Sequence, residues 1–223
     1  MNKAERSNNH DLVNKNLELI ISSKNYQLAH EDRELLNSDE MRGVRMLLEI
    51  SKPEKVLEEQ NILSTIIVFG GANLSEKATL DRKIEIAENS LNKKPTSNDI
   101  SREIIRLKNL RSMSHYYDSA REFARIVSRQ SQKKGCNSHV IVTGGGPGIM
   151  EAANRGSFDA DCKSIGLNIS LPNEQHPNSY ITPGLCFKFN YFALRKFHFV
   201  MRSVAAVFFP GGFGTFDELF ELL

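Results

Sequence analysis

The stretch that decides the fold of this 223-residue chain is Pro210-Gly-Gly-Phe-Gly-Thr-Phe-Asp-Glu218. It follows residues 203–209, a short run of small, β-branched and aromatic side chains that predicts a fully buried strand. The glycines allow positive φ angles and let a ligand approach the backbone. Thr215 and Glu218 have the spacing of a capping box, which would open an amphipathic helix. We therefore expect a strand, a glycine turn and a helix in succession.

The start of that helix is a candidate binding site for an anion. Its first N–H groups have no partner within the helix, and they favour a phosphate. The plainer interpretation is an ordinary turn between a strand and a helix, in which Glu218 only caps the helix. The stretch by itself leaves both interpretations open.

A second glycine loop, Gly144-Gly-Gly-Pro-Gly148, follows another apolar run at residues 138–143. Pro147 suits the first turn of the helix that we expect next. Parallel strands would bring both loops to the same carboxyl edge of a sheet, where such folds bind ligands. Neither loop is a P-loop, because no Gly-Lys-Ser/Thr follows, and neither is a clean Gly-x-Gly-x-x-Gly. The prediction is an α/β fold with a Rossmann-like, doubly wound parallel sheet.

Three segments together resemble the LONELY GUY (LOG) phosphoribohydrolases, a family formerly labelled lysine decarboxylases. The segments are Gly144–Ala153, Leu194-Arg-Lys196 and Pro210–Glu218, and the resemblance covers roughly residues 66–223. It implies an enzyme that hydrolyses the N-glycosidic bond of a nucleoside 5′-monophosphate, either AMP or a cytokinin nucleotide. The products would be the free base and ribose 5-phosphate. The resemblance also implies that no cofactor is needed and that the protein is a homodimer or a higher even oligomer.

The implied reaction needs charged groups beside the glycosidic bond. Cleavage passes through an oxocarbenium-like sugar, which calls for nearby negative charge, an activated water and help for the departing base. We expect Glu218 to orient the water and stabilise the cation, with Asp217 as the alternative acid. The resemblance directs Arg195 to the ligand, whereas helix geometry turns Lys196 about 100° away from it. The candidate substrate-binding residues are Gly144, Gly145, Gly146, Gly148, Met150, Lys196, Gly211, Gly212, Gly214 and Thr215.

The domain organisation that we expect is a helical N-terminal extension over residues 1–60 and the nucleotide-binding domain over residues 61–223. In the extension, Asn37 fits a cap for an amphipathic helix, and Ser51-Lys-Pro-Glu54 fits a second cap that would restart it. The chain stops within two turns of Glu218. Because a doubly wound sheet normally continues there, we expect the chain to be one piece of a longer protein.

Two segments of the domain are longer than the fold requires. Residues 75–134 are charged and helical in pattern, with a break expected at Pro95–Asp99 and Asp99 capping the second helix. Residues 171–183 are rich in proline and amide side chains and are long enough to serve as a lid. The first glycine turn carries Ala72-Asn73, where the family that the chain resembles usually has an arginine.

Further strands and a helix complete the expected domain. Asn190 can cap a helix at residues 191–202, on which Arg195 and Phe199 share a face. The other apolar runs predict strands at residues 65–69, 164–170 and 185–189.

Composition argues against several other classes of protein. The net charge of +2 comes from interspersed charges and gives no reason to expect binding to nucleic acid. No apolar stretch approaches ~18 residues and no secretory signal is present, so we expect a cytoplasmic protein without a membrane span. The cysteines Cys136, Cys162 and Cys186 are widely spaced, and no histidine has a second ligand at metal spacing. Free thiols and no metal are therefore expected.

Two other functions remain open. The same fold can bind a nucleotide as a sensing module without catalysis. A pyridoxal-phosphate-dependent lysine decarboxylase, as in the old family label, would need a Schiff-base lysine in a suitable site. No lysine of this sequence lies in a glycine-bounded site of that kind.

Overall fold

The computed structural model describes residues 3–93, 96–133, 137–170 and 176–223. Parts of three sequence predictions lie outside these residues: Pro95, Cys136 and residues 171–175 of the expected lid.

The chain forms two compact units, Met1–Leu48 and Glu49–Leu223, and helix α3 (Arg42–Glu59) runs across the boundary between them. The N-terminal unit is built from helices. Besides the start of α3, its elements are α1 (Lys3–Ile21), the short 3-10 helix η1 (Lys24–Tyr26) and α2 (Arg33–Asn37).

Both capping predictions for the N-terminal region are wrong. Asn37 is the last residue of α2, whose cap is Asp32, and the Asp32 side chain accepts a hydrogen bond from Leu35 N. No second helix starts at Ser51, because α3 continues through Pro53. The residue types at both positions fit a helix cap, but the helices of the structure begin at other residues.

Pro53 leaves one carbonyl of α3 without a donor in the helix, and His198, which belongs to the same unit, bonds to it. Proline has no N–H, so the carbonyl of Glu49, four residues earlier, loses its donor within the helix. His198 Nε2 lies 3.1 Å from this carbonyl oxygen. Because a carbonyl only accepts, Nε2 carries the proton and donates it to Glu49. This bond anchors α3 to the helix that carries His198.

The second unit contains a parallel sheet of five strands in the order β4-β3-β2-β1-β5. The chain adds β2, β3 and β4 on one side of β1 and then places β5 on the other side, which is a doubly wound order. This arrangement confirms the predicted α/β fold class. The strands are β1 (Thr65–Phe69), β2 (Val140–Thr143), β3 (Ser164–Ile169), β4 (Cys186–Phe189) and β5 (Ser203–Phe208).

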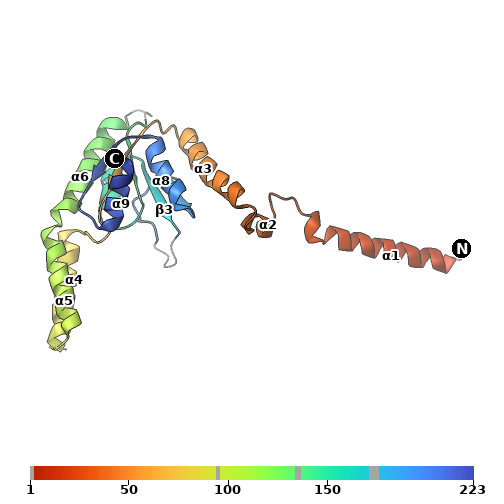
Figure 1. Ribbon diagram of the computed structural model, residues 1–223, viewed down its shortest axis with the longest axis horizontal. Helices are drawn as coiled ribbons and strands as arrows, with labels where there is room; N and C mark the ends of the chain where they lie inside the picture. Colours follow the sequence, from red (N-terminus) through yellow and green to blue (C-terminus); the bar gives the residue numbers. More distant parts are fainter. Residues whose placement is uncertain (1–2, 94–95, 134–136, 171–175) are drawn as a thin grey trace. The chain divides into compact units, whose positions relative to one another are not determined.

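Helices cover both faces of this sheet (Figure 1). Val68 packs on one face against the buried apolar residues of α6 and α7. Its neighbour Phe69 points to the opposite face, as alternation along a strand requires, and its ring lies 4.9 Å from that of Phe199 in α8. The helices are α4 (Lys77–Lys93), α5 (Asn98–Ser112), α6 (His115–Ser131), α7 (Ile149–Asp159), α8 (Phe192–Met201) and α9 (Phe213–Leu222).

The prediction that β5 is fully buried is wrong. β5 is the edge strand and pairs with β1 alone among the described strands. Val204 keeps 59% of its surface exposed, and Ala205 and Ala206 are also exposed. An apolar run predicts burial on both faces, but the run does not tell whether the strand lies at the centre of the sheet or at its edge.

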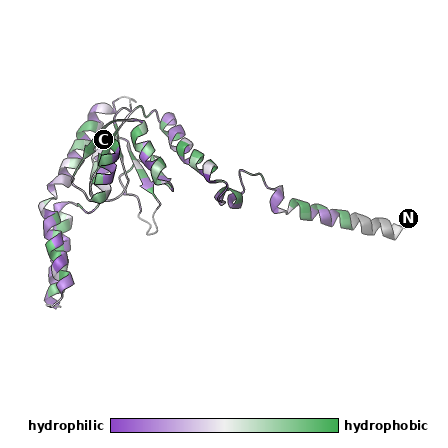
Figure 2. Cartoon of the chain, viewed as in Figure 1, coloured by the Kyte–Doolittle hydropathy of each residue, from purple (hydrophilic) through white to green (hydrophobic). Residues whose placement is uncertain are grey.

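The long segment after β1 folds as a helical pair that extends from the sheet (Figure 1). α4 and α5 lie side by side and bury Leu80, Ile84 and Leu107 in a small core of their own. Hydrophilic and hydrophobic residues mix along both helices (Figure 2). The expected break between them is confirmed, but the cap of α5 is Ser97 and not Asp99.

The caps of α8 and α9 also differ from the predictions. No side chain at the start of α8 caps it. Instead, Glu49 in α3 accepts hydrogen bonds from the backbone N–H groups of Asn190 and Tyr191, at 2.9 and 3.2 Å. α9 begins at Phe213 with Gly212 as its N-cap and no side-chain cap. Thr215 therefore lies inside the first turn, and the predicted capping box does not form.

Among the described residues, none of the helices combines the length and the apolar character needed to cross a bilayer.

We predict that Gly156→Ala destabilises the second unit by about 1–3 kcal/mol, because α6 and α7 pack closely at this glycine. A Cβ on Gly156 would lie 2.9 Å from Ala124 Cβ and closer still to the carbonyl oxygen of Arg121. Urea denaturation measures the loss. The matched control is Gly43→Ala in α3, where a Cβ meets nothing within 4 Å. That control should be neutral or slightly stabilising. Equal midpoints for the two variants would contradict the packing described.

Candidate functional site

Three glycine turns meet at the carboxyl edge of the sheet. The turn after β1 lies between the other two, because β1 lies between β2 and β5. Gly71 N donates a hydrogen bond of 3.0 Å to Pro210 O, and Ile149 N donates one of 3.1 Å to Gly71 O. The expectation that the Gly144 and Pro210 loops reach the same edge is confirmed. This edge includes the point where the strand order reverses, which is where doubly wound folds bind ligands.

Two glycines of the second loop are required by its geometry. Gly145 and Gly148 have φ angles of 73° and 76°, in the left-handed region that side chains rarely adopt. A Cβ on Gly148 would also lie 2.7 Å from backbone atoms of Ala72, where the turns of β1 and β2 touch. The loop therefore needs glycine for both conformation and space.

Arg195 lies against this loop from the other face of the sheet. Its Nε donates a 2.7 Å hydrogen bond to Leu167 O, and its guanidinium lies 5.3 Å from the centre of the Phe199 ring. A Cβ on Gly144 would collide with Arg195 Nη2 and would lie 2.9 Å from Met150 Sδ. The absence of a side chain at Gly144 thus gives the guanidinium its place beside the loop.

Glu218 approaches the same edge from α9. Burial raises the pKa of its carboxyl group to about 7, against the opposing influence of the nearby Arg195 and Lys196. Burial lowers the pKa of Arg195, and the charge of Glu218 partly offsets this effect. The two predicted catalytic residues therefore lie close enough to influence each other. A carboxyl group with a pKa near neutrality at a ligand-binding edge is typical of an acid or base in catalysis.

A cavity of about 260 Å³ opens beside Glu218, between α8 and α9. Its walls are mostly apolar, and the carboxylates of Glu218 and Glu221 and the ammonium group of Lys196 also line it. The residues that line it are Phe69, Ala193, Lys196, Phe197, Phe199, Val200, Glu218, Glu221 and Leu222.

Lys196 connects α8 to α9. Its Nζ lies 2.9 Å from an oxygen of Asp217 and 2.7 Å from one of Glu221. These hydrogen bonds raise the pKa of the Lys196 ammonium group, which keeps it charged. The structure gives Lys196 two carboxylate partners and shows no ligand contact for it. Its role in binding substrate therefore stays a prediction. Asp217, the alternative acid, is committed to the same ion pair.

The Pro210 loop contributes backbone and one hydroxyl. Gly212 and Gly214 have open space where a Cβ would be, so a ligand can approach both. A Cβ on Gly211 would collide with Thr215 Oγ1 and would lie 3.0 Å from Gly71 N. Thr215 is half-buried at this point. The predicted binding residues of this loop are therefore brought to the contact between the turns of β1 and β5.

Polar side chains that are not among the predicted site residues hold the Gly144 loop in place. Thr143 Oγ1 donates to Asn154 Oδ1 at 2.7 Å and accepts from Gly145 N at 2.9 Å. Asn178 Nδ2 donates to Gly146 O at 3.0 Å and to Asn154 Oδ1 at 2.9 Å. Thr143, directly before the glycines, is the residue from which this network could have been predicted. No pattern in the sequence indicates the role of Asn178.

The described residues contain no cluster of three or more histidine, cysteine, aspartate or glutamate side chains that could hold a metal ion. Cys162 and Cys186 are free thiols.

A family model described as "Possible lysine decarboxylase" matches residues 150–223, a segment that includes Arg195 and the whole Pro210–Glu218 stretch. Among solved structures, the X-ray structure of the structural-genomics target TM1055 is similar to this chain. The sequence identity is 20% and the TM-score 0.43, and the match covers 70% of this chain and 66% of that one. No curated protein matches the chain.

The raised pKa of Glu218 predicts how stability depends on pH. The folded state holds this proton up to about pH 7, whereas an unfolded glutamate releases it near pH 4.5. Stability from this group is therefore present below about pH 4.5 and lost as the pH rises through 7. Glu218→Gln removes that loss, so we expect it to be on the order of 1–2 kcal/mol more stable than wild type at pH 8, allowing for solvent screening, and equal at pH 4.5.

Denaturant midpoints at the two pH values measure this difference. Glu85→Gln, an exposed carboxylate on α4, is the control and should show no such pH-dependent gain. If the stability difference between Glu218→Gln and wild type is the same at pH 8 as at pH 4.5, burial does not disfavour the Glu218 carboxylate.

Proposed function

We propose that the chain is a hydrolase of the LONELY GUY type, which cleaves the N-glycosidic bond of a nucleoside 5′-monophosphate; the family match over residues 150–223 supports this proposal. The products are a free base and ribose 5-phosphate. The observation that carries the proposal is the meeting of Arg195 and Glu218 beside the glycine turns, with a pKa of about 7 for the Glu218 carboxyl group.

The 5′-phosphate has a suitable place at the glycine turns. Helices α7 and α9 both begin there, and their first N–H groups favour an anion. Gly212 and Gly214 leave the backbone open to a ligand, and the Thr215 hydroxyl lies beside the turn. We infer that the phosphate binds between the two loops and fixes the position of the ribose.

Glu218 then acts on the sugar. As the glycosidic bond breaks, positive charge develops at C1′ and the ring oxygen. The ionised Glu218 carboxylate stabilises this charge and orients the water that attacks C1′, from which it takes a proton. The water oxygen forms the new bond to C1′, and the electrons of the broken bond leave with the base. The base then takes up the proton that Glu218 removed from the water, which returns Glu218 to its ionised form.

Arg195 supplies the cation of the site. The guanidinium is held by the Leu167 carbonyl and by the Phe199 ring, so its position is fixed before a ligand arrives. From this position it stabilises either the phosphate or the electrons that the departing base receives.

Lysine decarboxylation, the activity in the family description, fits these residues poorly. Pyridoxal phosphate needs an amine that can form a Schiff base. Lys196 is the lysine of the site, and its ion pairs with Asp217 and Glu221 favour the charged ammonium form, which is not nucleophilic.

We predict that the purified chain releases base from AMP and that Glu218→Gln lowers turnover by at least 100-fold, because the carboxylate that stabilises the transition state is gone. Chromatography of the free base measures the rate across a panel of nucleoside 5′-monophosphates. Binding of AMP to the variant should persist, since the phosphate cradle is unchanged.

Asp217→Asn is the matched control, because it removes the neighbouring carboxylate on the same helix, and it should retain most of the turnover. Near-normal turnover in Glu218→Gln would remove Glu218 from the mechanism. AMP binding without release of base by the wild-type chain would instead favour a sensing module.

A further inference from the structure

The backbone N–H groups of the Gly144 loop fall into two groups. Gly145 N is bound inside the protein, because it donates a 2.9 Å hydrogen bond to Thr143 Oγ1. Gly146 and Gly148 are also buried, but among the described residues neither of their N–H groups has a hydrogen-bond acceptor. Buried N–H groups in proteins are almost always paired, so these two are the donors that the loop can offer to a ligand.

Asn178 fixes the direction of one of these donors. Its backbone N–H donates a 2.8 Å hydrogen bond to Gly145 O. The peptide bond between Gly145 and Gly146 is trans, so its carbonyl and its N–H point in opposite directions. The N–H of Gly146 is therefore turned away from Asn178. A carbonyl that accepts a hydrogen bond also polarises its peptide group, which makes the N–H of Gly146 a stronger donor.

The side chain of Asn178 holds the next peptide. Its Nδ2 donates to Gly146 O at 3.0 Å and to Asn154 Oδ1 at 2.9 Å, which uses both of its hydrogens. Its Oδ1 accepts a hydrogen bond of 3.2 Å from Tyr180 N. Asn154 is buried in α7. One side chain thus joins the glycine loop to α7 and to the segment at residues 176–180.

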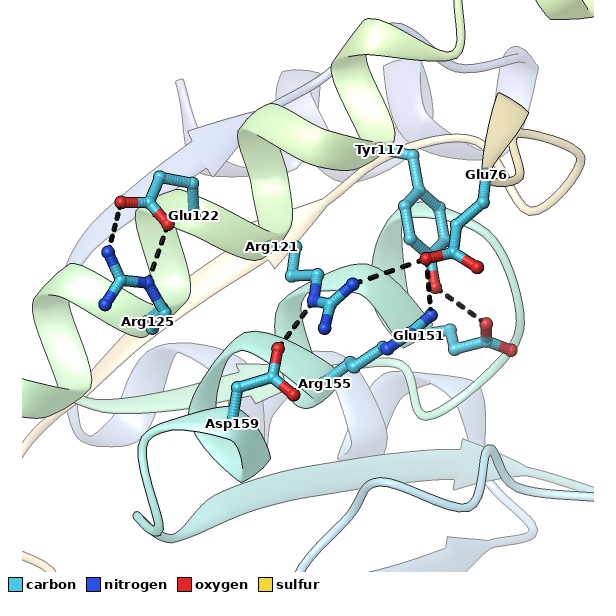
Figure 3. Close-up of polar contacts among 8 residues, drawn as sticks. All are labelled: Glu76, Tyr117, Arg121, Glu122, Arg125, Glu151, Arg155 and Asp159. Carbon is cyan, nitrogen blue, oxygen red and sulfur yellow. Dashed lines mark hydrogen bonds and ion pairs between the residues drawn. The ribbon is translucent and has the colours of Figure 1, made fainter. Parts of the chain in front are cut away.

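The segment that carries Asn178 has a second anchor at Tyr180. The Tyr180 ring lies 5.3 Å from the Arg155 guanidinium, close enough for a cation–π contact. Arg155 belongs to α7, and its Nη1 pairs with Glu76 Oε1 at 2.7 Å (Figure 3). Because this carboxylate holds the guanidinium, Tyr180 has a fixed partner. The segment is therefore attached to α7 on both sides of residue 179.

We propose that Asn178 is a positioning residue for the phosphate of the substrate: it holds the peptide between Gly145 and Gly146 so that the Gly146 N–H binds the 5′-phosphate. The inference rests on the proposed function and adds a residue to it. A peptide between two glycines meets little steric resistance to turning over, so its direction depends on what its carbonyl binds. Asn178 does not contact the phosphate itself and acts through the carbonyls of the loop.

The test measures the affinity of the full chain for ribose 5-phosphate by calorimetry. This probe carries the phosphate but no base, so its binding does not depend on catalysis. We expect Asn178→Ala to bind it about 10-fold more weakly than wild type, because a donor to an ionised group is no longer held in place. Ser179→Ala, an exposed neighbour in the same segment, is the matched control and should bind like wild type. Equal affinities for Asn178→Ala and wild type overturn the proposal.

The kinetics of AMP hydrolysis separate positioning from a general loss of structure. A phosphate contact is the same in the ground state and in the transition state. Asn178→Ala should therefore raise KM for AMP about 10-fold and change kcat by less than about 3-fold. A fall in kcat at unchanged KM contradicts the positioning role.

NMR spectra of the wild-type chain keep the proposal testable if Asn178→Ala does not fold. Saturating ribose 5-phosphate should shift the amide proton of Gly146 more than that of Gly145, whose donor stays on Thr143. A larger shift at Gly145 overturns the proposal.

The second anchor gives a smaller effect in the same direction. Tyr180→Leu removes the contact with Arg155 and should weaken ribose 5-phosphate binding by about 3-fold. Glu122→Gln is the control, because it breaks an ion pair with Arg125 elsewhere on α6 (Figure 3), and it should leave the affinity unchanged. A Tyr180→Leu variant that binds as tightly as wild type contradicts the role of this anchor.

The two proposals fail in different ways. Binding of ribose 5-phosphate that depends on Asn178, in a chain that hydrolyses no nucleotide, supports the positioning role and contradicts the hydrolase. Hydrolysis of AMP with a KM and a ribose 5-phosphate affinity that Asn178→Ala does not alter supports the hydrolase and contradicts the positioning role. A chain that neither binds ribose 5-phosphate nor hydrolyses AMP contradicts both.

Discussion

The backbone of Gly71 joins the three turns on which the rest of the site depends. Its N–H bonds to the Pro210 loop and its carbonyl bonds to the first residue of α7. The N–H and the carbonyl of this one residue therefore link the central turn to both outer loops. These contacts leave no room for side chains at Gly148 or Gly211, so the glycines reflect a shared packing constraint as well as freedom of the backbone.

Arg195 is positioned by a second set of contacts, which originates in α3. Pro53 leaves the Glu49 carbonyl without its helical donor, and His198 of α8 occupies it. The Glu49 carboxylate caps the start of α8, and Arg202 at its end bonds to Glu54 at 2.7 Å. α8 is thus held at both ends by one turn and a half of α3, and the helix that carries Arg195 has little freedom to shift along the sheet.

The sequence predicted the glycine turns, a parallel sheet and a shared helix face for Arg195 and Phe199, because these features depend on local residue types and on a repeated strand-turn-helix pattern. The sequence did not predict the features that depend on a contact with residues far away in the chain. The carboxylate that caps α8 belongs to Glu49, 141 residues before Asn190, and no residue pattern near Asn190 predicts this contact. The exposure of β5 depends on its place at the sheet edge. The ion pairs of Lys196 likewise required α9 to lie beside α8.

The most direct test of the proposed shared anion site is a titration of the ¹⁵N-labelled chain with ribose 5-phosphate, in which NMR spectra follow the backbone amide resonances. Because both loops would contact one phosphate, the amides of Gly145, Gly146 and Gly148 and those of Gly211, Gly212 and Gly214 should shift together with a single Kd. Shifts confined to one loop, or two different Kd values, would contradict the proposal that the glycine turns form one binding site.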